Sequence, residues 1–523
     1  MTTESIAAEP GGGRPIPPKD WLAGLKENLQ TDIVSGLIIF LIALPLCLGI
    51  ALASGAPPIS GVITGIVAGT LANLFSGSYV TINGPAAGMI VIVLGAVTEL
   101  GFRGALAVGV VTGFIQIGLG LARTGKLTGF FPLSVVHGML AGIGLIIMSG
   151  QIHIVVGHAN PREHGFHILT AIPHSVFDPV VETAIVGVAA ILVMVLWPRL
   201  GKVARVIPAP LAAVVIGTVI AIINGAGPRL DLQGGLLQGF QTPDFSAVLT
   251  GPGLKWVALY VFVASLESLL TAEAVDKLDP WKRRSDMNRE LIGKGIGNAV
   301  SSAIGGLPMI AEVVRSKANI MAGARTRWSN FFHGVFLFLF VLAVPGLLEL
   351  IPLAALAGIL MVVGFRLAHP ADFKHAWDIG KVDFALMTIT AFTVLLTDLL
   401  IGVATGIVLG ILHALFRSTS VANLFKPRME VTDDGSKVTL RFRGGLGFHN
   451  FIPVRGVLDN MPRGREVTLD FTQVHYVDPT VLERLHDFEV DYAYDGGTVT
   501  HVGESLKPGP HPFSTRTAPK VTV

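Results

Sequence analysis

Two interruptions of the apolar sequence carry residue types that could bind an ion inside a membrane. Residues 80–88 and residues 305–312 each combine glycine and proline with polar side chains, directly before an apolar stretch. Because proline suits the first turn of a helix, each interruption predicts extended backbone followed by a half-helix. The free N–H groups and the positive dipole end at such a start attract an anion. The competing interpretation is an ordinary loop between two spans.

Two carboxylates lie within apolar segments, where ionisable side chains are rare. Glu267 and Thr271 are four residues apart, which places them on one face of a predicted helix. Glu312 and Arg315 are three residues apart on the second half-helix. An ionisable group at membrane depth is costly and is a functional-site hypothesis by default. A purely structural ion pair between Glu312 and Arg315 is the alternative.

The composition requires a membrane domain to hold these residues. Of 523 residues, 51% are hydrophobic and only 14% are charged, too few charges to cover a soluble protein of this size. Residues 33–98 contain no charged side chain and can form two or three spans. The net charge of +2 predicts no nucleic-acid partner. Residues 427–523 hold 24 of the 74 charged residues, which indicates a separate soluble domain.

About fourteen apolar segments predict a polytopic helical protein in a lipid bilayer. With both termini cytoplasmic, the inner loops carry sixteen Lys and Arg residues and the outer loops carry four. This bias predicts an inner (plasma) membrane protein with both termini in the cytoplasm. The predicted segments are 33–53, 59–75, 85–99, 104–122, 133–156, 179–198, 208–224, 254–271, 292–305, 309–322, 329–345, 347–364, 382–397 and 399–416.

The ends of the chain differ from this central part. Alternating runs at 437–442, 467–471 and 498–502 predict strands, and 482–490 predicts a helix, which together indicate a small α/β domain. We therefore expect four segments. They are a flexible tail at 1–20, a transmembrane domain at 21–426, the α/β domain at 427–503 and a disordered Pro-rich tail at 504–523.

No motif for catalysis or for a bound cofactor is present in the sequence. Cys47 is the only cysteine, and its apolar surroundings favour a packing role. Five histidines between 153 and 174 fit no zinc spacing, so we expect no metal site and a solvated outer loop. There is no P-loop, which argues against ATP-driven transport. We predict no enzyme activity, no catalytic residue and no cofactor beyond a coupling ion.

The order and spacing of several short motifs resemble the SulP sulfate-permease family, the solute carrier 26 family of animals. The resemblance covers most of the chain and includes a C-terminal STAS-like domain. The motifs that carry it are Asp32–Leu37, Ala43-Leu44-Pro45, Asn83–Ala87, Glu267–Thr271, Arg315-Ser316 with Asn319, Ala322-Gly323 and Thr326, Leu469–Thr472, and Tyr476–Thr480.

This resemblance implies two inverted repeats of seven spans, divided into core and gate domains, in a homodimer that moves substrate by an elevator mechanism. Substrate would lie between the third and tenth spans. Glu267 and Thr271 match positions where sodium-coupled relatives bind their cation, so sodium or a proton is the expected coupling ion. The candidate substrate-binding residues are Asn83, Ala86, Ala87, Ala311, Glu312, Val313 and Arg315.

The sequence departs from the family pattern at three places. The first half-helix begins Asn83-Gly84-Pro85-Ala86 rather than Ser-Gly-Pro-Thr, Glu312 replaces a small or hydroxyl residue, and Thr480 stands where phosphorylatable relatives carry serine. Residues 310–316 resemble a subgroup often associated with carbonic anhydrases, which favours bicarbonate over sulfate. The leading hypothesis is an anion symporter. A proton-coupled nucleobase or dicarboxylate permease and an uncoupled anion channel are the alternatives.

Overall fold

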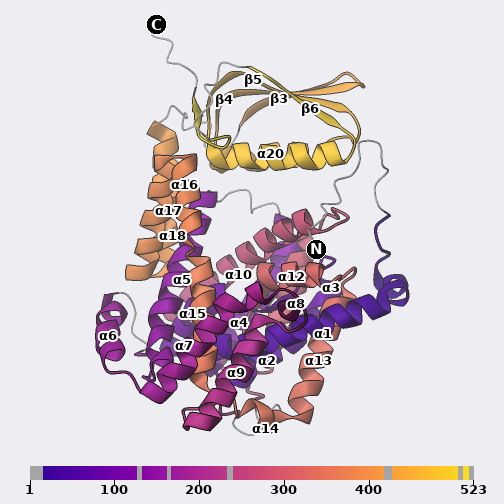
Figure 1. Cartoon of the computed structure of the whole chain (residues 1–523). Helices are drawn as coiled ribbons and strands as arrows, with labels where there is room; N and C mark the ends of the chain where they lie inside the picture. Colours follow the sequence, from indigo (N-terminus) through magenta and orange to yellow (C-terminus); the bar gives the residue numbers. More distant parts are fainter. Residues whose placement is uncertain are drawn as a thin grey trace. The chain divides into compact units, whose positions relative to one another are not determined.

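The protein forms two compact units, which Figure 1 colours by sequence. The structure is a computed structural model that describes residues 16–125, 132–161, 166–232, 239–416, 427–503 and 511–517. The first unit comprises residues 1–125 and 144–366, and the second comprises residues 126–143 and 367–523. Each unit is described separately below.

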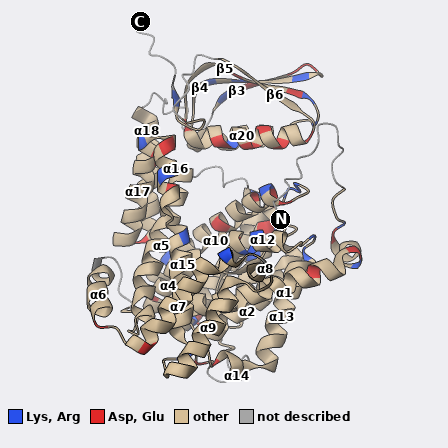
Figure 2. Cartoon of the chain, in the orientation of Figure 1, with Lys and Arg blue, Asp and Glu red and all other residues tan. Residues whose placement is uncertain are grey.

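Long apolar helices make up the first unit, as the hydropathy pattern predicts. Within the described residues, eight helices of the chain are long and apolar enough to cross a membrane. Figure 2 shows few charged residues on these helices. The helices are α1 (Trp21–Ala53), α2 (Pro58–Val67), α3 (Asn73–Phe75), α4 (Ile90–Leu121), α5 (Leu133–Val155), α6 (Phe166–Phe177), α7 (Val181–Leu196), α8 (Lys202–Val206), α9 (Ala209–Asn224), α10 (Gly251–Leu278), α11 (Met287–Ala303), α12 (Val313–Met321), α13 (Trp328–Ala343), α14 (Pro345–Leu348) and α15 (Leu353–Leu367).

Each predicted apolar segment coincides largely with a helix, but some boundaries are wrong. Helix α1 begins at Trp21, capped by the Asp20 carboxylate, and not near residue 33. The segments 85–99 and 104–122 belong to one helix, α4, which is interrupted at Gly101 with φ +73° and ψ 165°. The expected outer loop around the histidines contains helix α6. The predicted segments end where polar residues begin, whereas packing and capping allow the helices to continue through those residues.

The second unit contains three helices that precede a small α/β domain. The helices are α16 (Pro370–Ile379), α17 (Lys381–Leu396) and α18 (Leu399–Phe416), and the start of α5 belongs with them. The domain has a sheet of order β3-β4-β5-β6, and β7 pairs with β5. Figure 1 shows helix α20 along one face of this sheet. The elements are β3 (Arg428–Asp433), β4 (Lys437–Leu446), α19 (Phe451–Leu458), β5 (Glu466–Val477), α20 (Pro479–Tyr494), β6 (Thr498–Val502) and β7 (Arg516–Thr517).

The three predicted strands and the predicted helix of this domain are confirmed. Strands β4, β5 and β6 are parallel, and their inward residues form a core with α19 and α20. Strand β3 was not predicted because it is an edge strand whose residues are nearly all exposed, so it lacks alternation of apolar and polar residues.

Parts of both tails are ordered by contacts with their own unit. The Asp20 carboxylate pairs with Arg327 at 2.7 Å, and Arg516–Thr517 form β7 on the edge of β5. Residues 16–20 and 511–517 of the expected tails therefore make contacts within their own units. Residues 1–15, 417–426, 504–510 and 518–523 lie outside the described residues, and the expected boundary between residues 426 and 427 is at the end of the second of these ranges.

Candidate functional site

The two interruptions predicted from sequence meet in the first unit as a short antiparallel ladder. Strand β1 (Asn83–Pro85) pairs with β2 (Met309–Ala311), with Asn83 opposite Ala311 and Gly84 opposite Ile310. A half-helix follows each strand: a short 3-10 turn, η2 (Ala87–Met89), leads into α4, and Glu312 begins α12. Neither start has a side-chain cap, so the first N–H groups of both helices are free of intrahelical and capping partners.

The Arg315 side chain crosses from the second half-helix to the first. It is 1% exposed, and its Nη2 donates to the carbonyl of Pro85 at 3.2 Å. Gly84 makes this approach feasible because a Cβ there would lie 2.6 Å from Arg315 Nη1. The same nitrogen lies 3.9 Å from Cys47 Sγ on α1. A buried positive charge therefore lies where the two half-helices begin.

Glu267 approaches the first half-helix from α10. Its side chain is buried, and a Cβ on Gly88 would lie 2.2 Å from Glu267 Oε1, so the carboxylate lies directly against the η2 backbone. Thr271 follows one turn later on α10 and is also buried. Glu312 lies at the start of the second half-helix, beside Arg315, and the Arg315 side chain reaches the Pro85 carbonyl just before η2. The structure thus brings both predicted carboxylates to one junction.

The remaining predicted residues divide between two faces of the ladder. Since side chains alternate along a strand, Asn83 and Ala311 share one face. Gly84 and the following Glu312 belong to the other face, where Arg315 lies. Ala86 and Ala87 are buried at the start of η2, whereas the Val313 side chain is 40% exposed. Sequence spacing could not predict that Asn83 and Glu312 lie on opposite faces of the ladder, because the faces are set by how the two strands pair.

The junction concentrates buried polar atoms that have no partner among the described residues. Glu312 Oε1 lies 4.0 Å from Arg315 Nη2, which is an ion-pair contact but too long for a hydrogen bond. Buried polar atoms in proteins are normally satisfied, so such a cluster indicates a place where water, an ion or a substrate binds. The atoms are Glu267 Oε1, Glu312 Oε1 and Arg315 Nε near the half-helix starts, with Asn83 Nδ2 and Oδ1 on the other face of the ladder.

Polar side chains that the sequence did not single out hold the ladder in place. Asn298 Oδ1 on α11 accepts from Met309 N at 2.6 Å, and Ser268 Oγ on α10 accepts from Ala311 N at 3.4 Å. Ser316 Oγ accepts from Ile82 N at 2.8 Å. Ser268 is adjacent to Glu267 in the sequence. Its contact with Ala311 could not be predicted, because it depends on where β2 lies in the fold, and β2 is more than 40 residues further along the chain.

A buried ion pair fixes the segment that leads into β1. Glu290 and Lys294 on α11 are both 0% exposed and bond to each other. Glu290 Oε2 also accepts from Gly77 N at 3.1 Å and from Ser78 Oγ at 2.6 Å. Because Ser78 lies five residues before Asn83, these bonds hold the backbone that leads into the first strand.

The histidines of the expected outer loop make structural hydrogen bonds. His153 Nδ1 lies 2.7 Å from Ser175 Oγ, and His158 Nε2 lies 2.6 Å from the carbonyl of Asp178. Across the described ranges, no group of three His, Cys, Asp or Glu side chains could hold a metal ion. His164 lies outside those ranges.

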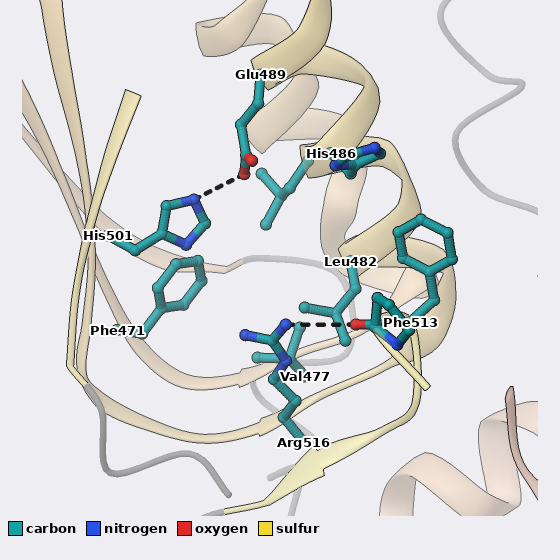
Figure 3. A pocket seen from close by; sticks show the side chains of 10 residues that line it. Phe471, Val477, Leu482, His486, Glu489, His501, Phe513 and Arg516 are labelled. Atoms are coloured by element: carbon teal, nitrogen blue, oxygen red, sulfur yellow. Dashed lines mark hydrogen bonds and ion pairs between the residues drawn. The ribbon is translucent and has the colours of Figure 1, made fainter. Parts of the chain in front are cut away.

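In the C-terminal domain, backbone N–H groups of the domain itself satisfy the buried Asp478 carboxylate. Asp478 Oδ1 caps α20 by accepting from Val481 N at 3.0 Å, and Oδ2 accepts from Phe448 N at 3.0 Å. Burial raises the pKa of the Asp478 carboxyl. A pocket of about 100 Å³ lies between α20, β5 and the segment 511–517, and His501 pairs with Glu489 across its rim at 2.7 Å (Figure 3).

Two half-helices that meet in a buried polar junction, within a polytopic helical fold, define the class of membrane transport proteins. Residues 29–390 match the Sulfate permease family, and the chain belongs to that family. The chain is 29% identical to a putative sulfate transporter, YvdB, of Bacillus subtilis, over 86% of this chain and 87% of the relative. It is 28% identical to the bicarbonate transporter BicA of Picosynechococcus, over 79% and 75% of the two chains.

Solved structures agree with this assignment. The transmembrane domain of a cyanobacterial bicarbonate transporter BicA aligns with a TM-score of 0.63 at 26% identity, over 73% of this chain and 97% of that one. SLC26A9 aligns with a TM-score of 0.67 at 16% identity, over 91% and 84%, which shows the shared fold. The predicted family and helical fold class are confirmed.

Proposed function

We propose that this protein is a secondary active transporter of a small inorganic anion, with bicarbonate favoured over sulfate. The observation that supports this most strongly is the junction itself. Two uncapped helix starts and the buried Arg315 guanidinium offer donors to an anion, next to buried polar atoms that lack partners. The relatives named above include both bicarbonate and sulfate transporters.

Glu267, with Thr271, binds the coupling cation, which is sodium or a proton. A buried carboxylate against the first half-helix repels an anion unless a cation neutralises it. Cation binding at Glu267 therefore favours anion binding at the half-helices, and the reverse holds by linkage. This arrangement supports symport over an uncoupled channel, because a passive anion pathway gains nothing from two carboxylates.

We extend the proposal to the architecture on the basis of the family and the charge bias of the loops. The transmembrane domain works by an elevator mechanism in a homodimer, in the inner (plasma) membrane, with both termini cytoplasmic. The C-terminal domain is STAS-like and serves assembly or regulation. Cross-linking in membranes and protease access to tagged termini test these features separately from transport.

Uptake by purified protein in proteoliposomes tests the proposed function. Labelled bicarbonate, sulfate, a dicarboxylate and uracil are each offered with and without imposed sodium and proton gradients. Gradient-driven bicarbonate uptake is expected. Uptake of uracil or a dicarboxylate alone would replace the proposal with one of the alternative permeases, and gradient-independent anion flux would indicate a channel.

A further inference from the structure

Glu312 is one of the three departures from the family pattern, and its side chain has an unusual position. Its Oε1 atom is buried, has no hydrogen-bond partner among the described residues, and lies 4.0 Å from Arg315 Nη2. A carboxylate beside an anion site is unfavourable unless something in the bound state compensates for it. The bound ligand is the natural source of that compensation.

We propose that Glu312 is a specificity-determining residue that selects a monovalent oxyanion carrying its own proton, such as hydrogencarbonate, over anions without one. This inference rests on the proposed anion site. An ionised carboxylate can only accept hydrogen bonds, so Glu312 Oε1 needs an O–H or N–H donor. Sulfate and nitrate have only acceptors and would leave this oxygen unsatisfied or face it with a lone pair.

The neighbouring donor completes the recognition. Arg315 Nε has no partner, and Arg315 Nη2 uses one contact for the Pro85 carbonyl. The separation of 4.0 Å between Nη2 and Glu312 Oε1 is too long for a direct hydrogen bond. A ligand that accepts from Arg315 and donates to Glu312 bridges this separation and satisfies both groups.

Charge favours the same class of ligand. Counted as ionised side chains before any cation binds, Arg315 contributes one positive charge, and Glu267 and Glu312 contribute one negative charge each, while Lys294 is already paired with Glu290. One coupling cation brings the junction to neutrality, so a monoanion leaves one negative charge and a dianion leaves two. The second charge is costly in a site shielded from water.

The test is competition against labelled hydrogencarbonate uptake in proteoliposomes, with sulfate and nitrate as competitors. Nitrate separates the hydrogen-bond argument from the charge argument, because it is a planar anion with the same single charge as hydrogencarbonate but without a proton. For the wild type, both competitors should be weaker than unlabelled hydrogencarbonate by on the order of 100-fold, which is the upper end of the cost of leaving one buried hydrogen-bonding group unpaired. Nitrate competing as well as hydrogencarbonate would overturn the role of the proton.

Substitution of Glu312 tests the assignment to this residue. Glu312→Gln offers an N–H donor and should bring sulfate and nitrate at least tenfold closer to hydrogencarbonate. Glu312→Asp keeps the carboxylate acceptor and should keep the preference for hydrogencarbonate, with weaker affinity. This variant tests the role of residue 312 if Glu312→Gln does not fold. Glu182→Gln removes an exposed charge on α7 and is the control.

The outcomes separate this inference from the proposed function. An unchanged preference in a folded Glu312→Gln protein overturns the role of Glu312 while transport stands. A folded Glu312→Asp protein that loses the preference would do the same. Uptake of none of these anions by the wild type would instead refute the proposed function.

Discussion

Helix starts in the membrane junction and in the C-terminal domain are built in different ways. Helix α20 begins with Asp478, whose carboxylate accepts from Val481 N and Phe448 N, so its first turn is closed by the protein itself. The half-helices after β1 and β2 begin without a side-chain cap, beside buried polar atoms that lack partners. A helix start whose donors are already satisfied stabilises a fold, whereas an unsatisfied one is available to a ligand.

Hydrogen bonds from the surrounding side chains hold the backbone of the junction in place. Asn298, Ser268 and Ser316 bond the backbone of the ladder, and the Glu290–Lys294 pair fixes the segment before β1. The same side-chain chemistry therefore has two uses in one molecule. Polar side chains around the junction bond to the backbone and hold it in place, whereas several polar atoms within the junction have no hydrogen-bond partner among the described residues and are available to a ligand.

The largest effect should come from breaking the buried pair. Lys294→Met leaves the Glu290 carboxylate without its countercharge and should destabilise the protein by about 3–5 kcal/mol. The melting temperature of the purified protein measures this. Lys317→Met, which removes an exposed lysine on α12, is the matched control. Adding Glu290→Gln should restore most of the loss, and equal melting of Lys294→Met and the control would contradict the role of the pair.

Added bulk at Ala311 in the β1–β2 ladder should strongly weaken anion binding. Ala311 is 0% exposed and pairs with Asn83, so Ala311→Leu adds bulk where no space exists and should weaken anion binding by about 100-fold or more. The measurement is the rise in melting temperature that a saturating anion concentration gives in the variant, compared with the wild type. Val314→Leu changes an exposed side chain one turn away and should bind normally. Normal binding by a folded Ala311→Leu protein would remove the site from this region.

Neutralising Glu267 should uncouple transport without removing it. Glu267→Gln resembles a permanently protonated carboxyl, so uptake should lose its dependence on the cation gradient while anion exchange continues. Uptake under imposed sodium and pH gradients, compared with anion exchange at equilibrium, measures the two activities. If the variant still accumulates anion as the wild type does, the coupling site lies elsewhere and Glu312 becomes the candidate.

Removing the C-terminal domain should reduce transport less than Ala311→Leu does. That domain has its own hydrophobic core, and none of the predicted site residues lies in it. A chain that ends at residue 427 should keep measurable uptake when it is inserted and folded. Complete loss in a well-folded truncation would show that the domain takes part in the transport step.

The smallest effect concerns the α20 cap. Asp478→Ala should cost about 1 kcal/mol in local stability, seen as faster hydrogen exchange in α20, whereas Asp478→Asn keeps an acceptor and should cost less. Because burial raises the pKa of Asp478, its protonated form favours folding, and that contribution is lost as pH rises through the raised pKa. The protection of α20 should therefore fall with pH in the wild type but not in Asp478→Asn.

The local sequence pattern was sufficient to predict most helices and strands and the two interruptions that precede the half-helices. Apolar segments predicted the helices, alternation predicted β4, β5 and β6, and proline with glycine predicted the two interruptions. Pattern failed where packing decided the outcome. The exposed strand β3 has no alternation, and α1 extends back to Trp21 because Asp20 caps it and also pairs with Arg327, far along the chain.

Sequence patterns alone indicate that Glu267, Glu312 and Arg315 lie in apolar surroundings, because few charged residues occur there and spacing assigns them to helices. Which of these side chains meet depends on how distant segments pack. The register of β1 against β2 places Glu312 and Arg315 on one face and Asn83 on the other. Ser268 and Asn298 gain their roles from the backbone of β2. Periodicity reports the local direction of a side chain, whereas a binding site depends on contacts between segments more than 200 residues apart.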